Sequence, residues 1–580
     1  MEPLFPSAPV AQASTPGKRA ESDSIEIELP KVNELPSADC YPITVMPAMS
    51  RLFLDYCAGA ATAWAFYASN PQPKSWHQRP ALPPHWPELV GLLRAQNPAP
   101  SAVGAAALAL DALAQGAGTV VTGQQVGLFG GTLYTPFKAA TAVARARQAT
   151  AAGHPHAAIF WLATEDHDFA EIDHVTFPAG RQLETLRYAE GNETAAARPV
   201  GGLIPVGGLI IDERITPLLE RAWELLEHSD AMEALAEAYK PGRTFAQAFA
   251  DFYTKLFAAQ GLLVLDASSR DFHRLGAPVL RAGIERADEF NAALLDRNRE
   301  LEAAGYHAQV NVAPDSSLLF LIDDKTGARV ALKRQPETAA EPNGLWQAGS
   351  QNYSTADLLG ILAAEPERIS PAALLRPVFQ DFLLSNSLTL GGAAEIAYFA
   401  QSAVLYEKIL GRQTVAEPRF FGTLIEPPIA ELLRKHELTL ERVFAESPSS
   451  LAQLLAARTL PVEGKQKLAA AGNAMDAELN ALVAWTAALD QGLGQSAETA
   501  AGKIRYQMNR LRTLAANFQL QKEASLTRHA DAISNALCPG GVLQERTHGG
   551  AYYFARYGLD LAETLCTQAD SCSGHSAIWL

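Results

Sequence analysis

Two short apolar runs, each followed at once by polar residues, constrain the fold of this chain more than any other feature. Val120-Val121 and residues 158–163 have the length and composition of buried strands. A glycine-rich turn follows the first run, and a cluster of acids and histidines follows the second. In an open α/β sheet, ligands bind beyond the carboxyl ends of the strands. The pattern therefore predicts an α/β fold with two polar clusters on one edge of a parallel sheet.

The glycine-rich turn contains Gly123, Gly127, Gly130 and Gly131 and precedes an alanine-rich helix that we expect to begin at Thr135. Backbone N–H groups of glycines beside a helix N-terminus can hold a phosphate or a carboxylate. The turn matches neither the nucleotide P-loop nor the dinucleotide fingerprint. A tight turn that only lets helix and strand pack closely is an equally good interpretation.

The second cluster begins with Glu165-Asp166-His167-Asp168 and continues to His174. If this segment is helical, His167, Glu171 and His174 lie on one face. A neutral imidazole beside carboxylates can act as a general base. A less favoured alternative is a divalent metal site made of His167, Glu171 and His174. An acidic helix start with no chemical role is the third interpretation.

Net charge, apolar runs and cysteine content exclude several classes of protein. A formal charge of −16 argues against nonspecific nucleic-acid binding, which depends on Lys and Arg. No apolar run approaches 18 residues, so we expect no membrane span, and the N-terminus lacks the order of a secretory signal. The five cysteines are few, odd in number and not set at zinc-finger spacing. We therefore expect reduced thiols in a cytoplasmic protein.

The chain divides into four parts by composition. Residues 1–40 are expected to form a flexible extension, and residues 41–422 an α/β core with insertions at about 200–370. Within that core, a helix at 244–259 precedes an apolar strand at 262–266, as a parallel sheet requires. Strand-like runs at 318–322 and 329–333 flank a turn and predict an antiparallel hairpin. Lys333 lies on this hairpin and is most simply interpreted as a surface charge.

Another predicted strand, residues 388–390, ends at Gly391-Gly392, and the helix that follows contains Glu395 and Tyr398 in its first two turns. Arg376 precedes Pro377, which disfavours helical geometry at the arginine. A guanidinium fixed in this way suits carboxylate recognition, although an ion pair with Asp381 is the simpler interpretation.

Residues 423–537 are predicted to be helical and to contain a coiled coil. Apolar residues from Leu468 to Phe518 keep helical spacing, and Gly492 and Gly494 between them suggest the tip of an antiparallel hairpin. A long amphipathic arm usually buries its apolar stripe against a second copy, so we expect a homodimer. Residues 538–580 are expected to return to the core, with the last dozen residues loose.

Five segments together closely resemble the bacillithiol-biosynthesis cysteine-adding enzymes, the BshC family. They are VTGQQVGLFGGTLYTPFK, FWLATEDHDFAEIDHV, LLRPVFQDFLL, LTLGGAAEIAYFAQ and PGGVLQER, in that order along the chain. The resemblance runs from about Ile43 to about Leu565, and the combination is specific although each piece alone is not. Departures are small: Thr132 and Ala393 follow double glycines where the family tends to have proline.

The resemblance implies a Rossmann-like core related to class I aminoacyl-tRNA synthetases, with inserted connecting segments and a coiled-coil domain that mediates dimerisation. It also implies the last step of bacillithiol synthesis, in which a ligase joins L-cysteine to glucosaminyl-malate. A carboxylate is a poor acyl donor, so we expect ATP to activate the cysteine carboxylate. The amine must then lose a proton, and the developing oxyanion needs fixed donors. Whether a metal takes part is left open.

Roles for single residues follow from this chemistry as hypotheses. His167 is the candidate base, oriented by Glu165 or Asp168. Residues 123–131, with Gln124 and Gln125, are candidates for the nucleotide or the activated carboxylate. Lys138 and Arg376 are candidates for the malate carboxylates, and Glu395 and Tyr398 for the amine and the sugar hydroxyls. Gly391 and Gly392 are candidates for close approach of the substrate. The alternatives are a nucleotidyl-transfer or metal-dependent enzyme on the same scaffold, and a non-catalytic protein built on the coiled coil.

Overall fold

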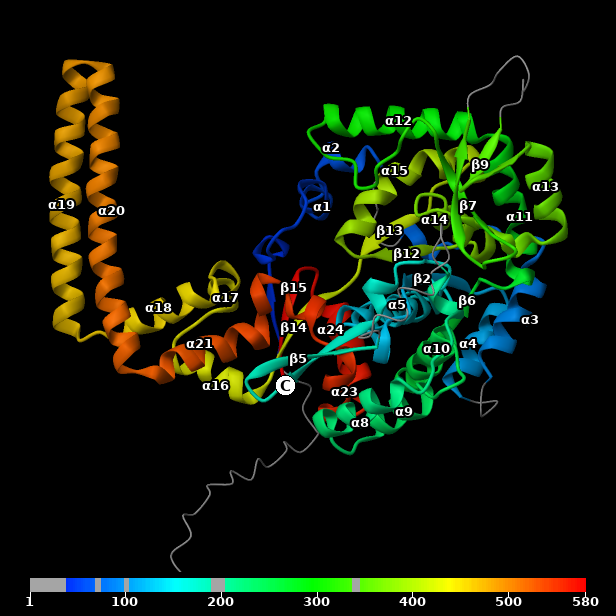
Figure 1. Cartoon of the computed structure of the whole chain (residues 1–580), viewed down its shortest axis with the longest axis horizontal. Coiled ribbons are helices and arrows are strands. Elements are labelled where there is room, and N and C mark those ends of the chain that lie inside the picture. The colour runs from blue at the N-terminus through cyan, green and yellow to red at the C-terminus, as the bar shows by residue number, and fades with distance from the viewer. Residues whose placement is uncertain (1–37, 68–74, 99–103, 189–203, 336–344) are drawn as a thin grey trace, which may run out of the picture. The chain divides into compact units, whose positions relative to one another are not determined.

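A five-stranded parallel sheet lies at the centre of the fold, in the order β13-β12-β2-β3-β6 (Figure 1). The computed structural model describes residues 38–67, 75–98, 104–188, 204–335 and 345–580. The strands are β2 (Gly118–Gln124), β3 (His156–Leu162), β6 (Leu263–Asp266), β12 (Leu388–Gly391) and β13 (Val415–Pro418). The predicted α/β class with a parallel-sheet core is confirmed, and β6 belongs to this sheet although it lies within the range expected for insertions.

Three helices precede or connect these strands: α5 (Tyr134–Ala151), α10 (Phe245–Leu256) and α15 (Ala393–Leu410). The start of α10 is fixed by a capping box, in which the Thr244 hydroxyl accepts from the Gln247 N–H and the Gln247 side chain accepts from the Thr244 N–H. Gly261, with a φ of 73°, then turns the chain into β6. The predicted helix and strand are confirmed here.

Alternate residues of the central strands face opposite sides of the sheet. Val120 and Phe160 pack into one core with α5 and α10. Val121 and Ile159 pack into a second core with α3 (Trp86–Gln96), α4 (Ala105–Ala114) and α11 (Arg270–Glu285). Helices therefore cover both faces, which explains why these strands are apolar at consecutive positions.

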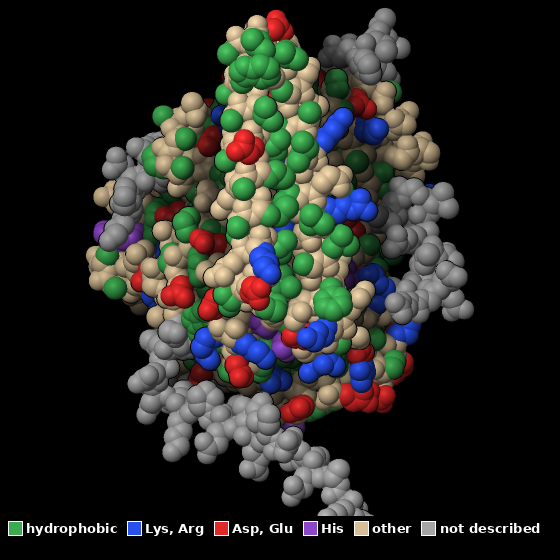
Figure 2. All heavy atoms as spheres, turned by 90° about the vertical axis from the view of Figure 1, so that its left-hand side faces the viewer, with side chains coloured by type: hydrophobic (Ala, Val, Ile, Leu, Met, Phe, Trp, Pro, Cys, Tyr) green, Lys and Arg blue, Asp and Glu red, His purple; other side chains and the backbone are tan. Residues whose placement is uncertain are grey.

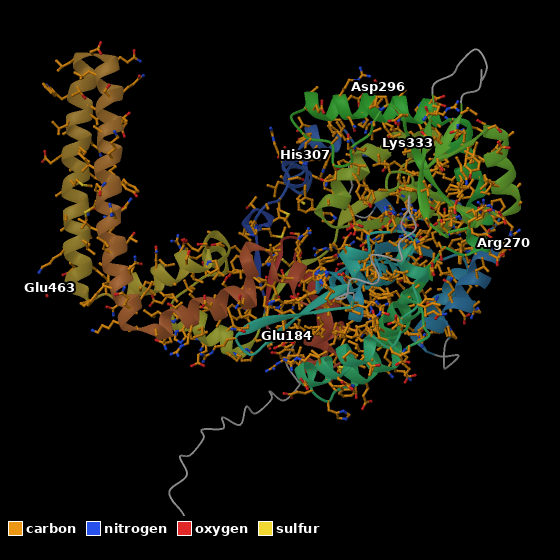
Figure 3. All side chains as sticks on the ribbon, viewed as in Figure 1. Glu184, Arg270, Asp296, His307, Lys333 and Glu463 are labelled. Atoms are coloured by element: carbon orange, nitrogen blue, oxygen red, sulfur yellow. A yellow bond between two sulfur atoms is a disulfide. The ribbon has the colours of Figure 1, made fainter. Side chains whose placement is uncertain are left out.

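An antiparallel sheet of order β10-β9-β8-β7-β11 forms an insertion between β6 and β12. It comprises β7 (Ser316–Ile322), β8 (Arg329–Arg334), β9 (Trp346–Ala348), β10 (Gln351–Tyr353) and β11 (Ile369–Pro371). The predicted hairpin is confirmed as β7 and β8. Lys333 lies at the surface, with its Nζ 3.7 Å from an Asp315 carboxylate oxygen, so the surface-charge interpretation holds (Figure 3).

Shorter elements complete this part of the chain. The helices are α1 (Arg51–Cys57), α2 (Ala61–Trp64), α6 (Phe169–Ile172), α8 (Ile215–Leu226), α9 (Asp230–Ala238), α12 (Ala287–Ala303), α13 (Thr355–Ala364) and α14 (Arg376–Leu384). A separate antiparallel hairpin joins β4 (His174–Ala179) to β5 (Gln182–Arg187).

The C-terminal third is largely helical. Its helices are α16 (Pro427–Lys435), α17 (Leu440–Ala445), α18 (Pro448–Thr459), α19 (Val462–Leu489), α20 (Gln491–Lys522) and α21 (Ala524–Leu537). The two long helices α19 and α20 pack side by side as an antiparallel hairpin (Figure 1). A Cβ at Gly494 would lie 2.8 Å from the Ala487 Cα, so the close approach at the tip requires glycine. The predicted coiled-coil hairpin is confirmed.

The end of the chain returns to the core through α22 (Gln544–Thr547), α23 (Gly550–Tyr557) and α24 (Leu561–Ser571), and α24 packs on α5. The prediction of a loose C-terminus is wrong. β15 (His575–Trp579) is the middle strand of a sheet, between β1 (Ala38–Tyr41) and β14 (Phe421–Ile425). Residues 1–37 of the expected extension lie outside the described residues, and the last three residues of that extension begin β1.

The expectation that all five cysteines are reduced is also wrong. Cys40 and Cys572 form a disulfide. Pairing of β1 with β15 brings their Cα atoms to 5.7 Å, although 532 positions separate them in sequence. Spacing along the chain gave no signal of this pair. Cys57, Cys538 and Cys566 are free.

Candidate functional site

The carboxyl ends of the parallel strands meet at one edge of the sheet. The register places Gln124 of β2 beside Leu162 of β3, and Gly391 of β12 beside Pro418 of β13. The polar segments after β2 and β3 therefore begin next to each other, and the start of α15 lies beside them. The prediction that both polar clusters share one edge is confirmed.

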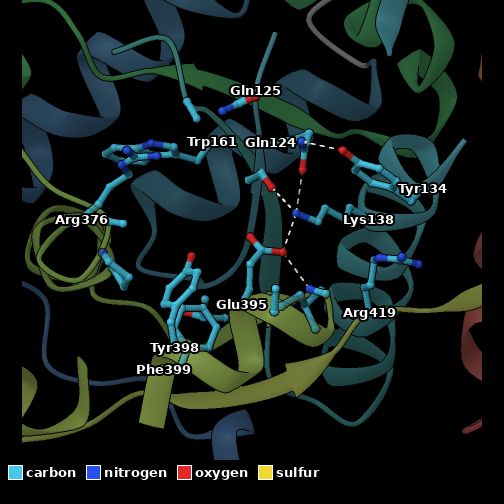
Figure 4. Close-up of a pocket in the computed structure, with 18 of the residues that line it drawn as sticks. Gln124, Gln125, Tyr134, Lys138, Trp161, Arg376, Glu395, Tyr398, Phe399 and Arg419 are labelled. Atoms are coloured by element: carbon cyan, nitrogen blue, oxygen red, sulfur yellow. Dashed lines mark hydrogen bonds and ion pairs between the residues drawn. The ribbon is translucent and has the colours of Figure 1, made fainter. Parts of the chain in front are cut away.

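A cavity of about 370 Å³ opens at this edge, within the range of small-molecule sites (Figure 4). Eight residues predicted for the nucleotide, carboxylate or substrate line it: Gly123, Gln124, Gln125, Lys138, Arg376, Gly392, Glu395 and Tyr398. Further lining residues with polar or aromatic side chains are Tyr134, Trp161, Asp166, Glu171, Gln380, Thr389, Phe399, Arg419 and Arg546. The predicted residues of three separate segments of the chain thus meet at one cavity.

Lys138 connects the end of β2 to the start of α15. Its Nζ donates to the Gly123 carbonyl at 2.7 Å and to the Gln124 side-chain oxygen at 2.9 Å, and it lies 2.6 Å from a Glu395 oxygen. The same Glu395 oxygen accepts from the Gly392 N–H at 2.7 Å and so caps α15. Burial lowers the pKa of Lys138, and the Glu395 carboxylate opposes that shift.

Asp166 occupies the other side of the cavity and forms ion pairs with two guanidinium groups. Arg376 donates through both terminal nitrogens, one of them at 2.9 Å, and an Arg329 nitrogen lies 3.6 Å away. Burial raises the pKa of Asp166, but the two arginines outweigh that effect and hold it below its ordinary value. Arg329 is almost fully buried and also donates to the Ser370 hydroxyl at 2.9 Å. Asp166 therefore fixes Arg376 at the cavity wall.

The conformation predicted for Arg376 is wrong. Arg376 is the first residue of α14, and Pro377 occupies the first turn, where the missing N–H costs no helical hydrogen bond. The alternative ion pair with Asp381 is also wrong, because that carboxylate pairs with Arg412.

Glu165 and His273 form a buried pair behind Asp166. The His273 Nε2 lies 3.1 Å from a Glu165 oxygen, and its Nδ1 lies 3.0 Å from the Ile369 carbonyl. Burial lowers the pKa of His273, yet the Glu165 carboxylate outweighs it and raises the pKa above the ordinary value. The structure therefore does not support the predicted contact in which Glu165 orients His167.

His167 lies near the cavity but does not line it. Its Nδ1 accepts from an Arg329 nitrogen at 3.3 Å, and its ring centroid lies 5.7 Å from that of Phe320. Burial and the Arg329 charge lower its pKa. A neutral ring that accepts at Nδ1 carries its proton on Nε2, so it presents a donor, not a base. No hydrogen bond joins Asp168 to His167 within the described residues.

The helical face proposed for His167, Glu171 and His174 does not form. α6 spans only Phe169–Ile172, and His174 begins β4, with its Nδ1 2.9 Å from an Asp173 oxygen. Across the described part of the chain, no three histidine, cysteine or acidic side chains lie close enough to hold a metal ion. The metal alternative therefore loses its geometric basis.

Glu171 is a lining residue with a shifted pKa. Partial desolvation raises the pKa of its carboxyl, and Asp168 and Asp166 add negative charge nearby. Among the described residues it forms no ion pair, unlike Asp166 and Glu395. It is the carboxylate of the cavity that is best placed to accept a proton.

Three of the predicted binding glycines serve packing. Tyr239 donates to the Gly127 carbonyl at 2.8 Å and accepts from the Gly130 N–H at 2.9 Å. A Cβ on Gly130 would lie 2.6 Å from the Phe252 ring, and Gly130 and Gly131 have φ values of 82° and 73°. These glycines and Gly391 do not line the cavity. The packing interpretation of this turn therefore describes the structure better.

Two cations of the cavity, Arg419 and Arg546, are not among the predicted site residues. Arg419 directly follows β13, whose four residues Val-Ala-Glu-Pro have no apolar run. Arg546 lies in PGGVLQER, a segment that we noted for its resemblance without giving any residue a role. Polar residues that directly follow the core strands are candidates for the cavity, and this rule identifies Arg419 once β13 is known.

These features define the class of protein: a Rossmann-like α/β protein with a polar cavity at the ends of its strands and a coiled-coil helical hairpin. Residues 38–420 match the N-terminal Rossmann-like domain of bacillithiol biosynthesis BshC, and residues 422–579 match its C-terminal coiled-coil domain. The chain therefore belongs to the BshC family of bacillithiol biosynthesis.

Three relatives, each named "Putative cysteine ligase BshC", align over nearly the whole chain. The protein of Koribacter versatilis is 41% identical over 93% of this chain and 99% of its own length. The protein of Solibacter usitatus is 34% identical over 92% of this chain and 98% of its own length. The protein of Salinibacter ruber is 30% identical over 90% of this chain and 95% of its own length. Among the described residues, no helix is both long and apolar enough to cross a membrane.

Proposed function

We propose that this chain is a cysteine ligase that forms an amide bond between the carboxyl group of L-cysteine and the amine of glucosaminyl-malate, the last step of bacillithiol synthesis. Family membership and the name given to its relatives support the ligase class. The observation on which the proposal chiefly rests is the cavity itself. It brings together fixed cations, a carboxylate without an ion pair and polar side chains at the ends of parallel strands.

ATP is the proposed energy source. An amide cannot form readily from a free carboxylate, so the cysteine carboxyl must first become an adenylate or an acyl phosphate. Gln124, Gln125 and the Lys138 ammonium lie at the end of β2, where they can contact the activated carboxyl. Their N–H donors also suit the oxyanion that develops when the amine attacks.

The base that deprotonates the amine is proposed to be Glu171 in place of His167. Glu171 lines the cavity, and the pKa of its carboxyl is raised toward the range in which a carboxylate accepts a proton effectively. His167 lies outside the lining and faces the positive Arg329 through its acceptor nitrogen. Tyr398 lines the same cavity and is proposed to contact a sugar hydroxyl.

The α19–α20 hairpin is proposed to form a homodimer. Large apolar side chains remain exposed along both helices, among them Leu482, Trp485, Leu489, Ile504, Leu511, Leu514 and Phe518. Figure 2, which faces this hairpin, shows hydrophobic side chains distributed along its surface. A stripe of this length is costly to leave in water, and a second copy of the hairpin offers a matching surface.

Mass spectrometry of the reaction tests the ligase proposal. Purified full-length protein is mixed with L-cysteine, glucosaminyl-malate and ATP, and cysteinyl-glucosaminyl-malate is measured. Product that depends on ATP supports the ligase and its energy source together. Absence of product with folded protein and all three substrates would contradict the proposal.

A further inference from the structure

Three cationic side chains, Lys138, Arg419 and Arg546, lie at one end of the cavity. Lys138 is paired with Glu395, and Arg419 with Glu545, whose oxygens lie 2.5 and 3.0 Å from the terminal nitrogens of Arg419. Arg546 lines the same end and forms no ion pair within the described part of the chain. Arg376, on the opposite side in Figure 4, is neutralised by Asp166. Arg546 is therefore the cationic side chain of the cavity that has no ion pair with a described residue.

Arg419 has a donor that the protein does not satisfy. The residue is only 3% exposed. Its terminal nitrogens donate to Glu545 and to the Phe420 carbonyl, but its Nε–H is buried and has no acceptor among the described residues. Buried donors of charged groups are nearly always satisfied, so an orphaned one at a cavity wall indicates a missing acceptor.

Gly392 leaves the space in front of this donor open. A Cβ at Gly392 would lie 3.7 Å from the Arg419 Nε and 3.4 Å from a Glu395 oxygen. The φ of Gly392 is −73°, which any residue can adopt, so the backbone does not require glycine there. The absence of a side chain instead provides room beside the Nε–H.

A second cavity of about 580 Å³ adjoins the first at this end and shares Ala393, Ala394 and Arg546 with it. The Arg546 guanidinium is thus at the junction of the two spaces. A ligand whose anionic end lies at the junction can extend into either of them.

We propose that the Arg419 Nε–H and the Arg546 guanidinium form a subsite for a carboxylate group at the acidic end of the amine substrate. The proposal rests on the proposed ligase function, because that function supplies a substrate with a dicarboxylate end. In this subsite Arg419 and Arg546 replace Lys138 and Arg376, which were the predicted ligands of the malate carboxylates. Lys138 and Arg376 are already paired with Glu395 and Asp166. A single carboxylate matches the one guanidinium that has no ion pair, whereas a phosphate brings nearly two negative charges close to Glu395.

Direct binding of small anions to the full-length protein tests the subsite. L-malate and inorganic phosphate are titrated separately, without ATP or cysteine, and followed by calorimetry. The wild type is expected to bind L-malate. Arg546→Gln is expected to weaken that binding at least tenfold, and Arg546→Lys to restore part of it.

Two further variants sharpen the test. Gly392→Ala fills the space before the Arg419 Nε–H and is expected to weaken L-malate binding severalfold. Arg270→Gln removes an exposed arginine at the start of α11 that does not line either cavity (Figure 3). This control is expected to leave L-malate binding unchanged. In the ligase assay, Arg546→Gln is expected to raise the KM for glucosaminyl-malate more than it lowers kcat.

Equal affinity of wild type and Arg546→Gln for L-malate would overturn the proposed subsite. The proposal would also be overturned if phosphate bound more tightly than L-malate and this phosphate binding weakened in Arg546→Gln. Failure of the ligase proposal gives a different result. In that case L-malate binds and depends on Arg546, yet no cysteinyl product forms with any energy source.

Discussion

At the scale of single residues, ion pairing decides which side chains of the cavity remain available for chemistry. Asp166 is engaged by Arg376 and Arg329, and Glu395 by Lys138. Glu171 has no such partner in the described residues, and the pKa of its carboxyl is raised. The density of acids and histidines in the sequence located this region, but only the structure distinguishes the paired carboxylates from the unpaired one.

Glu171→Gln tests the assignment of the base. The amide keeps the shape of the side chain but cannot accept a proton, so kcat is expected to fall by about 100-fold or more. His167→Gln, the matched variant, is expected to stay within a few-fold of wild type. Steady-state kinetics across pH measure both, and the acidic limb of the rate profile should disappear in Glu171→Gln. The reverse order of effects would restore His167 as the base.

His548 makes stability depend on pH. Burial lowers its pKa to about 4, and its neutral ring donates to the Asn535 carbonyl at 2.8 Å. An unfolded histidine titrates near 6.5, so the unfolded state binds more protons between about pH 6.5 and 4, and stability falls as the pH falls through this window. At about 1.4 kcal/mol per pKa unit, this group alone removes up to roughly 3 kcal/mol.

Urea unfolding at pH 7 and pH 5 measures this dependence. His548→Gln is expected to reduce the difference in unfolding free energy between the two pH values, and the exposed His228→Gln is the control that leaves it unchanged. An identical difference in wild type and His548→Gln would contradict the role given to His548.

At the scale of elements, apolar runs predicted β2, β3, β6 and β12 to within a few residues, because strands covered on both faces are apolar throughout. β13 was missed because Val-Ala-Glu-Pro has no such run. The helix considered from Glu165 onward does not form, because residues 163–168 are a loop in which Asp166 pairs with Arg376. Local patterns could not show a partner 210 positions away.

Gly130, in the turn between β2 and α5, and Gly153, in the turn between α5 and β3, form a matched pair of glycines. Gly130 and Gly153 have φ values of 82° and 88°, so alanine at either position adopts a disfavoured backbone conformation, at a cost of about 1–2 kcal/mol. Only at Gly130 would the new Cβ also meet the Phe252 ring, at 2.6 Å, whereas nothing lies within 4 Å at Gly153. Gly130→Ala is expected to cost about 1–3 kcal/mol more than Gly153→Ala in urea unfolding. Equal costs would contradict this account of the turn.

At the scale of the whole molecule, the sequence located the sheet and the coiled-coil hairpin but not the contacts that join the two ends of the chain. The antiparallel pairing of β1 with β15, and the Cys40–Cys572 disulfide beside it, link segments more than 500 positions apart. Neither segment has a pattern that specifies its partner. Long-range pairing of short strands is therefore the part of this fold that only the structure could supply.

The exposed stripe of the hairpin predicts an assembly that charged substitutions on α20 can disrupt. The double variant Leu511→Asp and Phe518→Asp places charge on two exposed apolar positions of α20 and is expected to convert a dimer to a monomer at micromolar concentration. Glu463→Ala, on the exposed surface of α19, is the control (Figure 3). Light scattering after size exclusion measures the mass. A wild type that is already monomeric would contradict the dimer.

A crystal structure of the protein with glucosaminyl-malate tests most directly whether the cavity at the ends of β2, β3, β12 and β13 binds the substrates. We expect the ligand between Arg376 and Arg419, with its amine toward Glu171 and a carboxylate at Arg546. A ligand ordered elsewhere would contradict it, for instance in the separate cavity lined by Arg181 and Arg556.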